Sequence, residues 1–229
     1  MKELPPIKYE DDPVIPPLDA TPPLRLGLIV EPTPFTHVCG YQNRFCEMLK
    51  YLCQAKDAVQ VVTTDVVEDA PTSIYNFPIY YSEGGRFAAY PEMVLSTDLK
   101  DRVIFSVLNV FRPDVIHCTS PSLFAFMSMF VSKWLKIPLV LSYHTHLPVY
   151  AAEYRQHFWI PGIVEAAWYL LTWGHSRADL TITTSPQIKA ELEERGIRQV
   201  CVWRKGVNTD VFHPRFKSAA MREELSDGN

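Results

Sequence analysis

The sequence of 229 residues lacks several features that would assign a protein to a functional class at once. It has no run of about 20 apolar residues able to span a membrane, because its longest apolar stretch, residues 123–131, ends at Ser132 and Lys133. It has no excess of basic residues, since the formal net charge is −4, and this argues against nucleic-acid binding. It also lacks the G-x-G-x-x-G pattern of nicotinamide-dinucleotide sites, which disfavours a nicotinamide-dependent enzyme.

Cysteine is scarce and is not arranged in C-x-x-C pairs. The chain has five cysteines, at positions 39, 46, 53, 118 and 201. An odd number without such a pair predicts free thiols in a reducing compartment. The spacing of seven between the first three favours buried small side chains over a metal site.

The first 23 residues are rich in proline and acidic side chains and show no helical or alternating period. We predict that residues 1–23 form an extended, weakly ordered arm. The arm resembles neither a secretory signal, which needs an apolar core, nor a transit peptide, which is poor in acidic residues. With 47% apolar residues overall, the remainder of the chain can build a globular core.

Beyond the arm, apolar segments typical of strands alternate with segments of helical period. The predicted strands are 24–30, 58–64, 114–120, 137–144, 179–185 and 199–205. The predicted helices are 41–54, 98–112, 120–136, 158–176 and 185–196, with Asp98 as a cap for the second. The secondary structure of residues 70–92 is not decided by the sequence pattern, and residues 74–81 could form an edge strand. This alternation predicts an α/β, doubly wound, mostly parallel Rossmann-like sheet covered on both faces.

In such a sheet, ligands bind beyond the carboxyl ends of the strands. Polar residues stand at these ends in five segments: Glu31, His117 with Ser120, His144 with His146, Ser185, and Lys205. Their convergence predicts a site for a small polar ligand without identifying that ligand.

The first strand is followed by EPTPFTHVCGYQNRF, residues 31–45, with Gly40 directly before a predicted helix. Backbone N–H groups at a helix start can hold a phosphate or carboxylate, and glycine allows close approach. A plain turn glycine is the alternative. Tyr41 and Arg44 flank the same turn as candidate ligand contacts, although an arginine one turn into a helix is more often a solvated side chain than an anion ligand.

His144 and His146 stand two residues apart in SYHTHLPVY, residues 142–150. On a continuing strand they would face the same side, but a zinc site needs a third ligand, so no metal is expected. Structural histidines are one alternative. The strand-end position favours contact of at least one imidazole with a substrate, because a neutral imidazole can donate to a sugar hydroxyl.

The predicted helix at 158–173 contains Trp159, Trp168 and Trp173. Periodic aromatic residues usually pack in a core, and an exposed lipid-binding face is the alternative. Glu165 and the lack of lysine or arginine in this helix argue against docking to an anionic membrane by this helix alone.

Four segments together resemble a known family. G-V-N-x-D-x-F-H-P at 206–214 resembles the segment joining the two domains of retaining GT-B glycosyltransferases. With EPTPFTHVCGYQNRF, RPDVIHCTSP (112–121) and SYHTHLPVY, it resembles the amino-terminal half of plant and cyanobacterial sulfoquinovosyltransferases, over residues 24–218. The resemblance implies transfer of sulfoquinovose from its uridine diphosphate donor to diacylglycerol. It also implies a peripheral location at a chloroplast envelope or thylakoid surface, or at a cyanobacterial membrane, and the cytoplasm is the alternative. The nucleotide sugar is then a substrate, and no cofactor is expected.

Carried over by position, the resemblance places Gly40 at the donor diphosphate and His144 at the transferred sugar, with His146 and Tyr150 on the acceptor side. The predicted site comprises catalytic His144 and the substrate-binding residues Glu31, Gly40, Tyr41, Arg44, His117, Ser120, His146, Tyr150, Lys205 and Asn208. The chain departs from the family at Gln42, where lysine is usual, and at Arg204, where asparagine is usual.

The resemblance also implies a domain division. Residues 24–205 would form the acceptor-side domain and 206–229 a hinge segment with a polar tail, while the donor-binding domain, with its diphosphate-binding cations, is absent from these residues. The chain alone is therefore expected to be a poor catalyst, because a leaving diphosphate needs neutralisation. The alternatives are a glycosyltransferase using another nucleotide sugar, such as a galactosyl- or mannosyltransferase, and a non-catalytic module that binds lipid or a nucleotide sugar.

Overall fold

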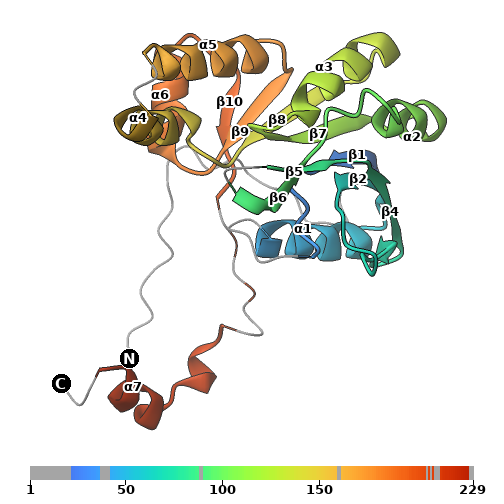
Figure 1. The fold of residues 1–229 in the computed structure, drawn as a ribbon. Helices are drawn as coiled ribbons and strands as arrows, with labels where there is room; N and C mark the ends of the chain where they lie inside the picture. Colours follow the sequence, from blue (N-terminus) through green and yellow to red (C-terminus); the bar gives the residue numbers. More distant parts are fainter. Residues whose placement is uncertain are drawn as a thin grey trace.

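The computed structural model describes residues 22–36, 42–87, 90–158, 161–204, 206, 208 and 212–226, and its centre is an eight-stranded sheet (Figure 1). The strands lie in the order β10-β9-β8-β7-β1-β2-β4-β3. Their bounds are β1 Arg25–Ile29, β2 Ala58–Thr64, β3 Ser73–Ile74, β4 Phe77–Ser82, β7 Val115–Ser120, β8 Leu139–Tyr143, β9 Leu180–Thr183 and β10 Val200–Val202. All neighbours pair in parallel except β3 with β4. The predicted fold class is confirmed.

Helices cover both faces of this sheet (Figure 1). The helices on the sheet are α1 Gln42–Gln54, α2 Val103–Phe111, α3 Phe124–Leu135, α4 Leu147–Phe158, α5 Ile163–His175 and α6 Pro186–Glu194. A 3-10 turn, η2, at Pro214–Phe216 and the helix α7, Ala219–Leu225, bury none of their residues and do not cover the sheet. Successive residues of β1 point to opposite faces, so Leu28 joins the cluster around Phe45 of α1, while Ile29 joins the cluster around α2 and α3. Thus α1 lies on one face, and α2 and α3 on the other.

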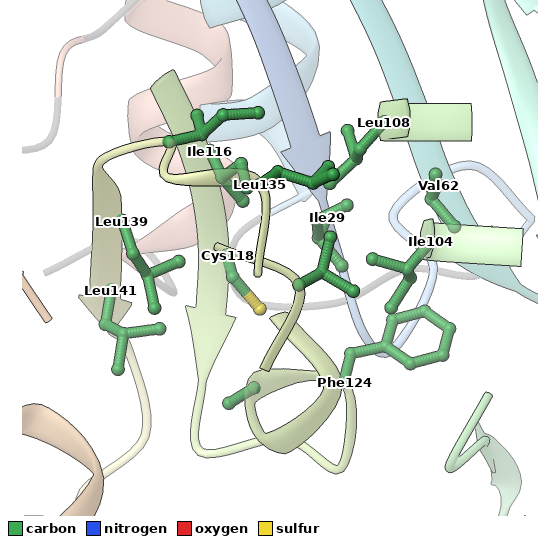
Figure 2. Close-up of a cluster of buried hydrophobic side chains, with 13 residues drawn as sticks. Ile29, Val62, Ile104, Leu108, Ile116, Cys118, Phe124, Leu135, Leu139 and Leu141 are labelled. Carbon is green, nitrogen blue, oxygen red and sulfur yellow. The ribbon is translucent and has the colours of Figure 1, made fainter. Parts of the chain in front are cut away.

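The larger core lies between the sheet and the helices α2 and α3 (Figure 2). Ile29 and Cys118 meet Phe124 and Ile104 there, and all four are fully buried. Tyr143 of β8 extends the packing on this face to Trp168 of α5, so α5 lies on the side of α3. Burial of this apolar area is the main force that fixes the helices on the sheet.

The connections place a topological switch between β1 and β7. From β1 the chain moves through α1 to β2 and β4, whereas β7, β8, β9 and β10 follow one another on the other side of β1. In open parallel sheets the crevice for a ligand lies at such a point, beyond the carboxyl ends of the strands. Glu31 follows β1 and Ser120 ends β7, so both stand at this switch.

The undecided stretch 70–92 contains two hairpins. The prolines and aromatics that obscured the pattern surround a turn at Tyr75 and Asn76, both with positive φ, which joins β3 to β4. β4 pairs in parallel with β2, and β3 is the edge of the sheet. A separate two-stranded sheet, β5 Gly85–Phe87 and β6 Tyr90–Leu95, follows.

Several predicted helix bounds need correction. The helix predicted at 120–136 spans Phe124–Leu135, and the helix predicted at 158–176 begins only at Ile163. Residues 147–158 form the helix α4, where the sequence predicted no helix up to 157, with Pro148 in its first turn, where a missing N–H is tolerated. The helix predicted at 98–112 begins only at Val103. Asp98 still caps it, because its carboxylate accepts hydrogen bonds from the N–H groups of Val103 and Ile104 at 2.8 and 2.9 Å.

Candidate active site

Glu31 lies at the switch point with its carboxylate buried against backbone groups. Its Oε1 accepts from the N–H of Ser96 at 2.6 Å, and its Oε2 accepts from Leu123 and Phe124 at 2.6 and 3.1 Å. Burial raises the pKa of Glu31 to about 7, against the lowering effect of these three donors. Glu31 therefore holds the start of α3 and the end of β6 in place. Its contact with a substrate stays a prediction.

Beside the switch point, four rings from four segments pack into one group, which we call the aromatic cluster: Phe45, His117, His144 and Trp203. Phe45 of α1 lies 5.9 Å from His117, 5.4 Å from His144 and 5.9 Å from Trp203, measured between ring centroids. Trp203, just after β10, lies 5.7 Å from His117 and 5.8 Å from His144. Four of these contacts are edge-to-face and that of Phe45 with His117 is tilted, and together they join side chains that lie far apart in the sequence.

Arg44 joins this cluster from the first turn of α1. Its Nη1 donates to the carbonyl of Trp203 at 2.9 Å, and its guanidinium lies 4.7 Å from the centre of the indole ring. Burial lowers the pKa of Arg44, but an arginine stays charged at neutral pH. A fixed positive charge therefore stands beside the histidines, in a position that suits an anionic ligand.

Both histidines of the cluster are neutral at physiological pH. Burial, followed by the nearby Arg44 and His117, lowers the pKa of His144 to about 3, and burial lowers that of His117 to about 4. A neutral imidazole can donate or accept a hydrogen bond without carrying charge. The arrangement therefore suits recognition of hydroxyl groups better than general-acid chemistry by a charged imidazolium.

One buried polar atom of the cluster lacks a partner. Nε2 of His117 has no hydrogen-bond partner among the described residues, and the side chain is only 7% exposed. Buried nitrogen atoms are normally paired, so an atom of this kind indicates a bound water or ligand group. It sits on the ring that faces Phe45 and Trp203.

His146 does not share this environment. β8 ends at Tyr143, so the rule that alternate residues share a face no longer applies, and the expectation that the two histidines face one side is wrong. The Nε2 of His146 lies 2.9 Å from Oε2 of Glu191 in α6, and its Nδ1 lies 3.1 Å from the hydroxyl of Tyr143. Its ring also contacts Trp168 of α5. His144 thus faces α1, and His146 faces the opposite layer.

Ser120 forms a second buried polar chain on the α5 side. Its hydroxyl lies 2.8 Å from Nε2 of His175, whose Nδ1 lies 3.0 Å from the hydroxyl of Thr181. Burial lowers the pKa of His175 to about 4. The side chain of Ser120 thus ties β7 to α5, while its carbonyl accepts from the N–H of His144 at 3.1 Å and supports the strand end beside the cluster.

The remaining predicted residues have separate positions. Tyr150 is 55% exposed on α4. Asn208 donates to Oε1 of Glu47 in α1 at 3.0 Å. Gly40, Tyr41 and Lys205 lie outside the described residues. The structure therefore brings Arg44, His117 and His144 together, and it places His146 and Tyr150 elsewhere.

The sequence reasoning missed Phe45 and Trp203 as members of the site. Phe45 lies within the predicted helix 41–54 and Trp203 within the predicted strand 199–205, and neither was singled out as a site residue. Their positions could have identified them. Trp203 follows the last strand and Phe45 lies in the first turn of the first helix, so both lie at the carboxyl edge of the sheet, where this fold binds its ligands. No group of three or more possible metal ligands occurs in the described part of the chain, and none of its helices is long and apolar enough to cross a membrane.

Comparison with known proteins identifies relatives of this chain. The profile described as Glycosyltransferase Family 4 matches residues 38–211. The chain is 38% identical over 221 residues to Sulfoquinovosyl transferase SQD2 of Arabidopsis thaliana, covering 95% of this chain and 42% of that protein. It is 32% identical to the GDP-mannose-dependent alpha-mannosyltransferase of Mycobacterium tuberculosis, covering 89% of this chain and 53% of the relative.

A solved structure agrees with the fold. Sucrose-phosphate synthase from Thermosynechococcus elongatus superposes with a TM-score of 0.59 at 19% identity, over 89% of this chain and 52% of that one. The chain thus spans about half, or less, of the length of the proteins that it matches. The family profile confirms the resemblance seen in the motifs: the chain belongs to Glycosyltransferase Family 4 and has the fold of the amino-terminal half of a GT-B glycosyltransferase.

Proposed function

We propose that this chain is the acceptor-side domain of an enzyme that transfers sulfoquinovose from UDP-sulfoquinovose to diacylglycerol. The observation that carries the proposal is the 38% identity to Sulfoquinovosyl transferase SQD2 over 95% of the chain. In the transfer, the bond between the anomeric carbon and the donor diphosphate breaks, and the acceptor hydroxyl bonds to that carbon. The hydroxyl proton leaves, and uridine diphosphate departs.

The aromatic cluster supports a contact of His144 with the transferred sugar. Its imidazole is neutral, stands at the carboxyl edge of the sheet and lies near the cation of Arg44. The unpaired Nε2 of His117 offers a second hydrogen-bonding atom to the same ligand. We assign catalytic contact to His144, and ligand positioning to His117 and Arg44.

The domain division follows from the same resemblance. We propose residues 24–205 as the acceptor-side domain and 206–229 as a hinge segment with a polar tail. In this proposal Gly40 and Lys205 contact the substrate, and Tyr150 of α4 belongs to the acceptor side. The diphosphate-neutralising cations would come from a donor-binding domain, so the chain alone should be a poor catalyst. We propose a peripheral location on a chloroplast membrane, because the acceptor is a lipid.

A transfer assay tests the function. The chain alone, and the chain joined in frame to the carboxyl half of Sulfoquinovosyl transferase SQD2, are incubated with diacylglycerol and UDP-sulfoquinovose, and the lipid product is measured by mass spectrometry. We expect product from the joined protein and little from the chain alone. His144→Ala should lower turnover of the joined protein by at least about 100-fold. Tyr51→Ala, at an exposed ring on α1 outside both the cluster and the hinge segment, is the matched control.

A second candidate is mannosyl transfer, favoured by the 32% identity to a GDP-mannose-dependent alpha-mannosyltransferase. The same assay with GDP-mannose, UDP-galactose and UDP-glucose separates the candidates. Product with GDP-mannose but not with UDP-sulfoquinovose would replace the proposed donor. Donor or lipid binding without transfer by the joined protein would favour a non-catalytic module instead.

A further inference from the structure

The outer face of α3 exposes three aromatic side chains in a row, which we call the α3 stripe: Phe126, Phe130 and Trp134. They recur every fourth residue and therefore stand on one side of the helix, over a length of about 12 Å. Their exposed fractions are 44%, 59% and 67%. The rings of Phe130 and Trp134 stack on each other, with centroids 6.0 Å apart, and so form one continuous apolar surface.

Helix α5 extends this surface. The ring of Trp173 lies 5.8 Å from that of Phe126, and Tyr169 and Leu170 are 67% and 48% exposed. Helices α3 and α5 lie on the same side of the sheet (Figure 1). A contiguous exposed apolar surface of this kind marks a site of interaction on a soluble domain. Trp168 of α5 is buried, so the exposed aromatic face belongs mainly to α3 and not to the helix that the sequence singled out.

The charge around the stripe differs from that of the whole chain. Residues 103–112, 124–136 and 163–177, which contain α2, α3 and α5, carry four cationic side chains, Arg112, Lys133, Lys136 and Arg177, and one acidic side chain, Glu165. The whole chain has a net charge of −4. Lys133 directly precedes Trp134, and the guanidinium of Arg177 lies 4.0 Å from the centre of the Trp173 ring. Exposed aromatic rings flanked by lysine and arginine are the composition that favours the interface of an anionic bilayer.

Other occupants fit this surface less well. Trp203 and Asn208, which follow β10, lie on the opposite face of the sheet, because Trp203 contacts Arg44 and Asn208 contacts Glu47, both in α1. A second copy packed through the same face would bring the cationic side chains of two molecules together, which costs association energy.

We propose that the α3 stripe, with Lys133 and Lys136, docks the protein on the surface of an anionic lipid bilayer, with α3 lying in the plane of the interface. The inference deepens the proposed function and rests on it for its purpose, since diacylglycerol is reached from a bilayer. Binding itself requires no sugar transfer. The attraction combines burial of the rings at the headgroup boundary with the attraction of the lysines to acidic lipids.

Vesicle co-sedimentation tests the docking surface. The full chain is mixed with vesicles of phosphatidylcholine alone, or of phosphatidylcholine with phosphatidylglycerol, and the bound fraction is measured. We expect binding to the anionic vesicles and little to the neutral ones. The double variant Phe130→Ser/Trp134→Ser should weaken binding by at least about tenfold, because two rings no longer enter the interface. Lys133→Glu/Lys136→Glu should weaken binding by at least about tenfold on anionic vesicles.

Tyr51→Ser is the matched control, because Tyr51 is 45% exposed on α1, the opposite layer of the fold, and should bind as the wild type does. All substituted side chains are exposed, so circular dichroism should show an unchanged fold. Equal binding of the wild type and the stripe variant, or no binding to anionic vesicles, would overturn the inference. A wild-type dimer in lipid-free solution that the stripe variant makes monomeric would reassign the surface to self-association. Vesicle binding without sugar transfer would instead contradict only the proposed function.

Discussion

Arg44 holds Trp203 by two contacts at once, a hydrogen bond of 2.9 Å to its carbonyl and a guanidinium 4.7 Å from the centre of its ring. Arg44 belongs to the first helix and Trp203 follows the last strand in chain order. The contact therefore joins the first helix to the end of the last strand. A second link, from Asn208 to Glu47, lies about one helical turn further along α1. Trp203 and Asn208 are thus both tied to α1, and Trp203 lies beside His144.

Removing the charge of Arg44 should raise the pKa of His144. The pKa of about 3 has burial as its largest cause and the charge of Arg44 as the next. Arg44→Met should therefore move the pKa upward, but not to the ordinary value near 6.5, because burial remains. A pH titration of histidine side-chain NMR signals measures it. Arg177→Met, which removes a cation on the other layer, should leave the His144 signal unchanged.

Trp203→Ala should destabilise the protein by about 2 kcal/mol, because three ring contacts and the platform for Arg44 are lost from a half-buried site. Urea denaturation followed by circular dichroism gives the free energy of unfolding. Trp134→Ala is the matched control: this exposed indole should change stability by less than about 0.5 kcal/mol. Equal effects of the two substitutions would show that the aromatic cluster contributes no packing energy.

The sequence predicts strands better than it predicts the directions of side chains at their ends. The strand at 58–64 has the predicted bounds because its apolar β-branched residues fit only a buried strand. The helix α4 escaped prediction because its sequence lacks one clear apolar stripe. His144 was placed at the strand end correctly, but the direction of His146 depends on the end of β8 at Tyr143 and on its contacts with Glu191 and Tyr143. Neither partner is adjacent to His146 in the sequence.

Glu31 shows the same limit. Its place after the first strand was predictable, whereas its burial under the start of α3 depends on the packing of β7 against β1. A position at the ligand edge therefore does not by itself make a side chain a ligand contact. The contacts among Arg44, Phe45 and Trp203 likewise could not be predicted from local sequence, because they join α1 to the end of β10, at opposite ends of the sheet-forming part of the chain.

Acid should destabilise the protein through its buried histidines. The pKa values of His117 and His175 are lowered to about 4, so below pH 6.5 the unfolded chain binds protons that the folded chain does not. Each histidine should therefore reduce the free energy of unfolding by about 2 kcal/mol on going from pH 6.5 to pH 5. Glu31 acts in the opposite direction, because its raised pKa adds stability at low pH that is lost as pH rises through about 7.

Urea denaturation at pH 7 and pH 5 measures the balance of these groups. We expect a lower free energy of unfolding at pH 5 than at pH 7, because the lowered pKa of His144 adds a third destabilising group to His117 and His175. Glu31 acts in the opposite direction and cancels about as much free energy as one histidine removes. NMR titration checks the cause separately. A His117 or His175 signal that titrates near pH 6.5 would contradict the assignment, whatever the stability measured.

Glu31→Gln should lower the free energy of unfolding by about 1–3 kcal/mol at pH 5, where the buried carboxyl is neutral and both side chains are compared without a buried charge. The difference should shrink above pH 7, where ionisation of the buried carboxyl costs the wild type stability. Both carboxylate oxygens accept N–H groups, from Ser96 on one side and from Leu123 and Phe124 on the other. An amide offers only one oxygen, so its NH₂ group must face a buried N–H donor, which is left unsatisfied. Glu193→Gln, at a partly exposed glutamate of α6, is the control and should change stability by less than about 0.5 kcal/mol. If Glu31→Gln were as stable as the wild type, the carboxylate would not hold the start of α3. Glu31 would then be a candidate for direct contact with the ligand, as its position after β1 predicts.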